Sequence, residues 1–232
     1  MKRDFSQKKQ IKPRVAVVQR SKDLLESVDE RFNIKKIFIY TEGGDERKYF
    51  NGLEREFNST RVEIICEDCG GSDSFTVAKK AQSLFESNIE DDSSPENYEK
   101  YLVFDADDNF TRIDLKTGKS KAELAKEFCV KENFGIIFSN MCLEVWILCH
   151  YCDPFISFRS EDLCDRKFLK KETKKRGNRY SKLKLLQDVA IKNAQNLIKM
   201  HKANKVDIYS KRSNPVTQIG ELILHLKKEY ER

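Results

Sequence analysis

The chain has 232 residues, a net charge of +6, and 35% charged against 39% hydrophobic residues. This length allows one large core, or a medium domain with a smaller helical region, and the composition is typical of a soluble globular protein. The seven cysteines favour a reduced compartment, and the absence of a long apolar run or a signal-like N-terminus excludes a membrane protein, so we expect a cytoplasmic location.

Residues 1–33 are predicted to form a basic, weakly structured arm with one short strand at 15–18. From residue 34 to 153 short apolar segments alternate with amphipathic ones. The apolar segments predict strands and the amphipathic ones predict helices. Buried strands between helices are typical of a parallel sheet covered on both faces. We therefore expect an α/β, Rossmann-like domain with strands at 36–40, 62–66, 101–104 and 135–138. The expected helices are at 45–57, from a cap at Ser72 or Asp73 to 87, at 120–131 and at 141–151.

Residues 90–99 are polar and predict a loop. Beyond Asp153-Pro154 the apolar spacing becomes helical throughout. We expect a basic helical C-terminal region over residues 154–232, with helices at 160–170, 181–202 and 215–230.

Acidic side chains follow two of the predicted strands. Glu42 comes after the first strand, and Asp105, Asp107 and Asp108 come after the third. Ligands of an open parallel sheet collect at the carboxyl ends of its strands, so we expect these acids to meet there. Clustered carboxylates repel one another unless a cation neutralises them, and Mg²⁺ or Mn²⁺ takes such oxygen ligands beside phosphates. The four acids are the predicted metal ligands.

Gly43 and Gly44 follow the first of these acids and precede a predicted helix. Residues without a side chain let a phosphate approach the backbone near a helix start that favours anions. An acid after a single strand is more often a turn residue or a helix cap. The combination of Glu-Gly after one strand and Asp-x-Asp after another is more specific for a metal site.

The helix predicted at 141–151 contributes further candidates. Asn140 precedes it and can orient a water, a phosphate or Glu42, or cap the helix. Glu144 can act as a buried acid behind the site, and His150 as a catalytic base. A packed histidine at a helix end is the commoner role for such a residue.

The stretch from 166 to 184 carries ten Lys or Arg residues against Glu172 alone and includes Phe168 and Tyr180. Such a segment can hold a phosphate backbone while an aromatic ring stacks on a base. A solvated loop between helices is the alternative. The residues we predict to bind nucleic acid are Lys174, Lys175, Arg176 and Arg179.

These motifs together resemble the Toprim domain, and within it the RloB-like family. The resemblance rests on "IYTEGGDERKYFNGL", "VFDADD", "FSNMCLEVWILCHY", "AIKNAQNL" and "SNPVTQIGELI". It covers most of the chain. Asp45, Met141 and Leu143 stand where the family usually has threonine, proline and phenylalanine.

The resemblance implies a Toprim-type nuclease that acts as an effector of abortive infection against phage, often together with an ATPase. It implies that Glu42 is the general acid or base and that Asp105 and Asp107 hold Mg²⁺ or Mn²⁺. Glu46 also occupies a matching position and joins the predicted catalytic residues. The substrate would be DNA or RNA, with tRNA one option.

Two other functions stay open at this point. The sheet can instead serve as a non-catalytic docking or regulatory subunit of an ATPase-containing defence complex, with its acids facing a basic partner surface. A Mg²⁺-dependent phosphotransfer enzyme on a flavodoxin-like sheet is a weaker alternative. A receiver-type version would leave the helical extension unexplained.

Overall fold

Five strands form one sheet in the computed structural model, which describes residues 34–89 and 97–231. Their order is β2-β1-β3-β4-β5; the first four are parallel, and β5 runs antiparallel to β4. This confirms the predicted α/β, Rossmann-like class, and adds a strand that the sequence did not predict. The strands are β1 (Lys35–Thr41), β2 (Val62–Asp68), β3 (Tyr98–Asp105), β4 (Gly135–Asn140) and β5 (Val216–Thr217).

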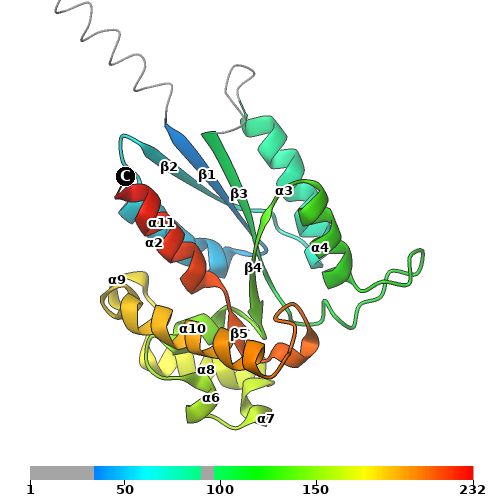
Figure 1. The fold of residues 1–232 in the computed structure, drawn as a ribbon, viewed down its shortest axis with the longest axis vertical. Coiled ribbons are helices and arrows are strands. Elements are labelled where there is room, and N and C mark those ends of the chain that lie inside the picture. The colour runs from blue at the N-terminus through cyan, green and yellow to red at the C-terminus, as the bar shows by residue number, and fades with distance from the viewer. Residues whose placement is uncertain (1–33, 90–96, 232) are drawn as a thin grey trace, which may run out of the picture. The chain divides into compact units, whose positions relative to one another are not determined.

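Helices connect the parallel strands and then make up most of the C-terminal part (Figure 1). No helix in the described part of the chain combines the length and apolar character needed to cross a membrane. The helices between strands are α2 (Gly44–Phe57), α3 (Ser74–Asn88) and α4 (Lys121–Lys131). Those that follow β4 are α5 (Leu143–Cys149), α6 (Pro154–Ser157), α7 (Ser160–Leu163), α8 (Arg166–Arg176), α9 (Tyr180–Leu183), α10 (Gln187–Ala203) and α11 (Ile219–Tyr230), with short 3₁₀ turns at Lys184–Leu186 and Lys211–Ser213.

The two faces of the sheet bury separate apolar clusters. Ile37 and Ile39 of β1 point to the cluster formed with α2, α5, α10 and α11, and Phe38 and Tyr40 point to the one formed with α3 and α4. All four side chains are fully buried. Alternate residues of a strand face opposite sides, so a continuously apolar strand is one covered on both. The sheet is thus a central layer, with α3 and α4 on one side and α2 and α11 on the other (Figure 1).

Several predicted boundaries are wrong. Residue Tyr98 already belongs to β3, where it pairs with Lys36 of β1, so the predicted loop at 90–99 ends earlier. The helix predicted at 160–170 is divided into α7 and α8, because the Asp165 side chain accepts a hydrogen bond from the Lys167 amide and starts a new helix. The helix predicted from 215 begins at Ile219, after β5.

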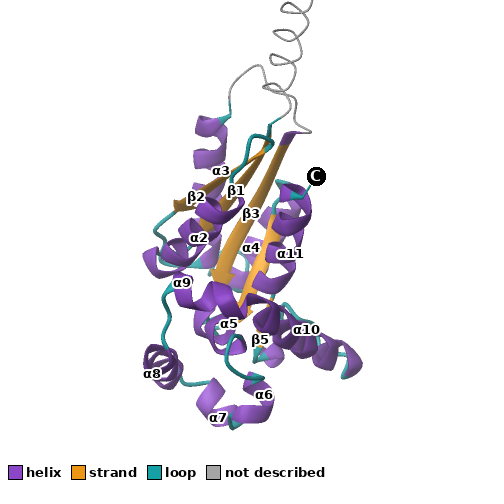
Figure 2. Ribbon diagram, turned by 90° about the vertical axis from the view of Figure 1, so that its left-hand side faces the viewer, coloured by secondary structure: helices purple, strands orange, loops and turns teal. Residues whose placement is uncertain are grey.

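The C-terminal part belongs to the same compact unit as the sheet, which begins at Lys35. It supplies β5 beside β4, and its helices α6, α7 and α8 lie beyond the arrowhead ends of β3 and β4 (Figure 2). The predicted division after residue 153 stays a prediction. The predicted basic arm at 1–33, with its strand at 15–18, lies outside the described residues.

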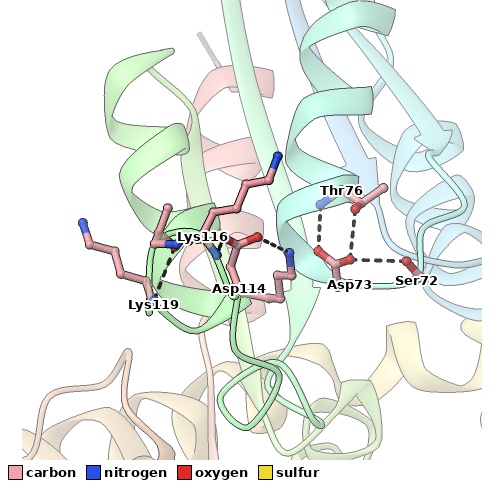
Figure 3. Close-up of polar contacts among 8 residues, drawn as sticks. Ser72, Asp73, Thr76, Asp114, Lys116 and Lys119 are labelled. Carbon is pink, nitrogen blue, oxygen red and sulfur yellow. Dashed lines mark hydrogen bonds and ion pairs between the residues drawn. The ribbon is translucent and has the colours of Figure 1, made fainter.

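Two aspartates organise the loops on the α3–α4 side (Figure 3). Asp73 caps α3 by accepting hydrogen bonds from the amide and hydroxyl of Thr76, at 3.0 and 2.9 Å. Asp114 accepts hydrogen bonds from the amides of Lys116 and Thr117, both at 3.1 Å, in the turn before α4. The Asp73 contacts fix the start of α3, and Ser72 just before it lines a cleft together with Glu42, Asp107 and Asp108.

Candidate active site

The strand order places a crevice between β1 and β3. The chain moves from β1 outward to β2 and then returns to β3 on the other side of β1. The loops after β1 and β3 therefore diverge at their carboxyl ends, which is where open α/β sheets bind ligands. Glu42 follows β1 directly, and Asp105 is the last residue of β3. The sheet topology thus brings the two predicted acidic motifs to one crevice.

The turn after β1 is held by Thr41, whose hydroxyl lies 3.3 Å from the carbonyls of both Gly43 and Glu67. Gly43 is the N-cap of α2, and a Cβ added there would lie 3.1 Å from Glu46 Oε2. A side chain at this position would therefore press on the Glu46 carboxylate. Glu46 also takes a hydrogen bond from its own backbone amide. The start of α2, where we predicted phosphate to approach, is consequently occupied by a carboxylate in this state.

The turn after β3 is fixed by backbone contacts. The amide of Ala106 donates to Ser139 O at 2.8 Å and that of Asp107 to Met141 O at 3.2 Å. Asn109 Nδ2 donates to Asp105 O at 2.9 Å, and its Oδ1 accepts from the Ser74 amide at the same distance. Asp107 has a φ of +30°, a left-handed conformation that a non-glycine residue adopts at some cost. Such strain at a strand end is a feature of functional sites.

We use the term acid cluster for Glu42, Glu46, Asp105 and Asp107. Burial and the nearby Asp107 and Glu46 raise the pKa of Glu42 to about 7, against a backbone hydrogen bond at Asp105. Burial and the other three acids hold the pKa of Asp105 well above its usual range. The pKa values of Glu46 and Asp107 are also raised, mainly by burial. Four carboxyl groups so close and so buried disfavour their own ionised forms.

Arg166, the first residue of α8, supplies positive charge to this cluster. Its guanidinium forms an ion pair with Asp107 Oδ2 through Nη1, and its Nη2 lies 3.9 Å from Asp105 Oδ2. It also lowers the pKa of Glu42 and Glu46. Arg166 was not among the predicted site residues, although it begins the basic stretch. A helix start after Asp165 was the only local signal for it.

The acid cluster provides carboxylate oxygens, the type of ligand atom that a hard divalent cation prefers. Glu42 Oε2 is buried without a hydrogen-bond partner, and the cluster carries more carboxylates than Arg166 can neutralise. Carboxylate oxygens are the ligands that Mg²⁺ prefers. Among the described residues, however, no three His, Cys, Asp or Glu side chains are already gathered as a metal site. Arg166 lies between the two aspartates that would have to converge.

The remaining predicted acids lie at the margin of the cluster. Asp108 is exposed and 3.8 Å from Arg112. It lines a cleft of about 430 Å³ together with Glu42, Asp107 and Arg166. Glu144, near the start of α5, has a buried Oε2 without a hydrogen-bond partner. It lies close enough to raise the pKa of Asp107 and Glu46.

Asn140 and His150 are directed elsewhere. Asn140 is the last residue of β4, and the cap of α5 is Cys142 instead. The side-chain amide of Asn140 donates to Ser210 O at 3.1 Å and to Ser213 Oγ at 3.2 Å. His150 is buried, with Nδ1 3.0 Å from Trp146 O. Burial lowers the pKa of His150 to about 4. These contacts are of the kind that hold a fold together, and neither set includes a member of the acid cluster.

A second, larger cavity of about 880 Å³ runs between α2, α5 and α9, and we call it the α2–α9 groove. Glu144 and Asp45 line it, so it borders the acid cluster. Of the four predicted nucleic-acid-binding residues, Arg179 lines this groove. Lys175 and Arg176 lie 3.9 and 3.6 Å from Glu172, and Lys174 is exposed. The other cations of the groove, which the sequence analysis did not select, are Lys48, Arg55 and Lys184.

Comparison with known protein families identifies the family of this chain. Residues 37–226 match the family described as RloB-like protein. Comparison with curated proteins and with solved structures found no match. The matched range includes both acidic motifs, Arg166 and the α2–α9 groove.

Proposed function

The chain belongs to the RloB-like family, and from that premise and the acid cluster we propose that it is a divalent-metal-dependent phosphodiesterase. In this proposal it is a Toprim-type nuclease that hydrolyses DNA or RNA, with tRNA among the substrates to test, as an effector of abortive infection. The observation that carries the proposal is the buried group of carboxylates at the β1–β3 crevice, with Glu42 Oε2 unpaired. Buried carboxylates without partners lower the stability of the folded protein, and groups of this kind are concentrated at functional sites.

Each acid has a role in this proposal. Asp105 and Asp107 would hold the Mg²⁺ or Mn²⁺ ion together with Glu42, and Asp108, at the rim of the cleft, would be a further candidate ligand. When bound, the ion supplies stabilisation of the charge that develops on a phosphoryl oxygen. In the metal-free protein the pKa of Glu42 is raised to about 7, so Glu42 can hold or release a proton near neutral pH, and a bound cation would lower this pKa. Glu46 adds negative charge that helps to raise the pKa of Glu42, and Glu144 does the same for Glu46, so both favour a cation at the cluster.

The α2–α9 groove offers a path for the nucleic-acid backbone. Four cations, Lys48, Arg55, Arg179 and Lys184, line it, and Tyr180 lies between the last two in the chain. Lysine and arginine neutralise phosphates, and an aromatic ring can stack on a base. Because the groove also reaches Glu144, a strand held there would be led toward the acid cluster. The proposed place of action is the cytoplasm, with a partner ATPase of the same defence system.

One observation favours a non-catalytic docking subunit instead. Ile113 and Leu115, in the segment before α4, are 50% and 98% exposed. Exposed apolar side chains in one segment are typical of a surface that another protein covers. In this alternative the acid cluster, already partly neutralised by Arg166, would face a basic partner.

One assay separates the two functions. The full-length protein is incubated with plasmid DNA, single-stranded DNA and total tRNA, in Mg²⁺ or Mn²⁺, with and without the proposed partner ATPase. Glu42→Gln and Asp105→Asn should abolish cleavage. Glu127→Gln, an exposed acid on α4 paired with Lys119, should cut like the wild type. No cleavage in any combination, with ATPase binding that survives both substitutions, would favour the docking subunit.

A further inference from the structure

The arginine that contacts the acid cluster has an incomplete set of partners. Arg166 contacts Asp107 with one guanidinium nitrogen and lies 3.9 Å from Asp105 with another, while its Nε is buried without a hydrogen-bond partner. A guanidinium has five N–H donors, so this pose leaves part of its capacity unused. Its side chain is 42% exposed and lines the 430 Å³ cleft beside Glu42 and Met141. The pairing is therefore open to solvent on the cleft side.

The backbone that carries Arg166 is fixed, although its side chain is long. Asp165 caps α8 through the Lys167 amide at 2.8 Å, and Leu169 and Thr173 of α8 are buried. Asn214 Nδ2 donates to Leu163 O at 3.0 Å and ties down the end of the preceding helix. The guanidinium can consequently change partners within the cleft without any movement of α8.

We propose that Arg166 is an exchangeable counter-cation: it pairs with Asp105 and Asp107 in the metal-free protein, yields them to a divalent cation, and then binds a phosphate of the nucleic acid. This inference rests on the proposed function, because it assigns the two aspartates to the metal. Both cations need the same oxygens, so they compete for them. The arginine that leaves carboxylates is matched in charge and geometry to phosphate, which it can bind through two N–H groups.

Competition of this kind gives Arg166 two opposite effects. Without nucleic acid it opposes metal binding, because the metal must displace it. With metal bound it supports nucleic-acid binding, because it is then free for a phosphate. A residue with a purely structural role would weaken both kinds of binding when removed.

The first experiment measures Mn²⁺ binding alone, by the loss of the free Mn²⁺ signal in electron paramagnetic resonance, on full-length protein without nucleic acid. Arg166→Gln should bind Mn²⁺ roughly tenfold tighter than the wild type, because a competing cation is gone. Arg159→Gln is the matched control. It removes an exposed arginine that pairs with Asp162 at 3.0 and 3.1 Å and contacts none of the predicted metal ligands, and it should change Mn²⁺ affinity by less than about twofold.

Asp105→Asn separates failure of this inference from failure of the proposed function. If neither the wild type nor Arg166→Gln binds Mn²⁺ in a manner that Asp105→Asn abolishes, the metal-dependent function and the inference both fail. If Asp105-dependent binding is present but Arg166→Gln leaves it unchanged or weaker, the inference alone fails. If circular dichroism shows that Arg166→Gln does not fold, Arg166→Lys replaces it in the Mn²⁺ measurement, because an ammonium group cannot bridge both carboxylates. It should bind Mn²⁺ tighter by a smaller factor, and equal or weaker binding would overturn the inference.

The second experiment tests the phosphate role with a fluorescein-labelled phosphorothioate single-stranded DNA, which resists cleavage. At saturating Mn²⁺, Arg166→Gln should lower the affinity of the protein for this DNA roughly tenfold. In EDTA the same substitution should lower it less than about twofold, because Arg166 of the wild type is then paired with the aspartates. An equal loss in both conditions would contradict the exchange of partners.

Discussion

Gly52 of α2 lies directly against the ring of Tyr180 in α9: a Cβ at position 52 would be 2.3 Å from the ring Cγ. This contact closes one wall of the α2–α9 groove, and Tyr180 is further held by a hydrogen bond to Glu56. The absence of a side chain at position 52 therefore sets where Tyr180 and the neighbouring Arg179 lie.

We expect Gly52→Ala to lower the free energy of unfolding by about 1–3 kcal/mol, because the Tyr180 ring must move to make room. Urea denaturation measures this loss. Gly44→Ala is the control on the same helix, since its Cβ would meet Asp68 Oδ2 at an ordinary 3.6 Å. Its stability should stay within about 0.5 kcal/mol of the wild type or rise slightly. Equal stability of the two variants would show that Tyr180 does not depend on Gly52.

The carboxylate of Glu99, on β3, makes the free energy of unfolding depend on pH in the acid range. Burial acts to raise its pKa, but hydrogen bonds from His225 and Lys35 outweigh burial and lower the pKa from 4.5 to about 2. A lowered pKa in the folded state contributes stability that is present above pH 4.5 and is lost as the pH falls toward 2.

Glu99→Gln should therefore cost about 1–3 kcal/mol of unfolding free energy at neutral pH. The difference from the wild type should shrink as the pH falls below 4.5. Urea denaturation across this pH range measures it. Glu63→Gln, at a carboxylate 47% exposed and 4.0 Å from Lys36, should change stability by less than about 0.5 kcal/mol. A Glu99→Gln deficit that does not vary with pH would contradict the pairing.

Local signals in the sequence account for the sheet and its first helices. The apolar run at Ile37–Tyr40 could only be a strand buried on both faces, and it is. Asp73 and Ser120 were predicted starts of helices and do cap α3 and α4, the latter with a capping box completed by Glu123. Because parallel strands place their carboxyl ends at one edge, Glu42 and Asp105 could be brought together without a structure.

What the sequence could not supply depends on distant contacts. Strand β5 has two residues and exists because Ser139 and Asn140 pair with Thr217 and Val216. Arg166 is 59 positions from Asp107, and nothing in its neighbourhood distinguishes it from the other cations of the basic stretch. The sequence allowed Asn140 to be predicted as a site residue, but in the structure its side-chain amide donates hydrogen bonds to residues 210–213.

Arg179 and Lys174, both predicted to bind nucleic acid, should differ in effect. Arg179 lines the α2–α9 groove, whereas Lys174 is exposed at the end of α8. Arg179→Gln should weaken binding of single-stranded DNA and reduce the slope of log affinity against log salt by about 1, while Lys174→Gln should change it by less than half as much. Fluorescence anisotropy over a salt series measures the slopes, and Lys116→Gln, in the turn before α4, is the control. Equal slopes for Arg179→Gln and Lys174→Gln would place the nucleic acid outside the groove.

Glu42 should lower the stability of the folded protein when no metal ion is bound. Its Oε2 is buried without a partner, and burial with the neighbouring acids raises its pKa to about 7. An ionised Glu42 is therefore disfavoured in the folded state, and Glu42→Gln removes the charge while its amide can donate to the carboxylates around it. At pH 8 in EDTA we expect Glu42→Gln to raise the free energy of unfolding by about 1–3 kcal/mol.

Thermal and urea denaturation at this pH measure the gain. Asp108→Asn, at a side chain that is 77% exposed on the same rim, should stay within about 0.5 kcal/mol of the wild type. Saturating Mn²⁺ should reverse the order of stability, because the cation stabilises the ionised acid cluster of the wild type and finds fewer charges in Glu42→Gln. If Glu42→Gln were less stable than the wild type in EDTA, Glu42 would have a stabilising partner in solution. The acid cluster would then not be destabilised without a metal ion, which would contradict the proposed metal-dependent function.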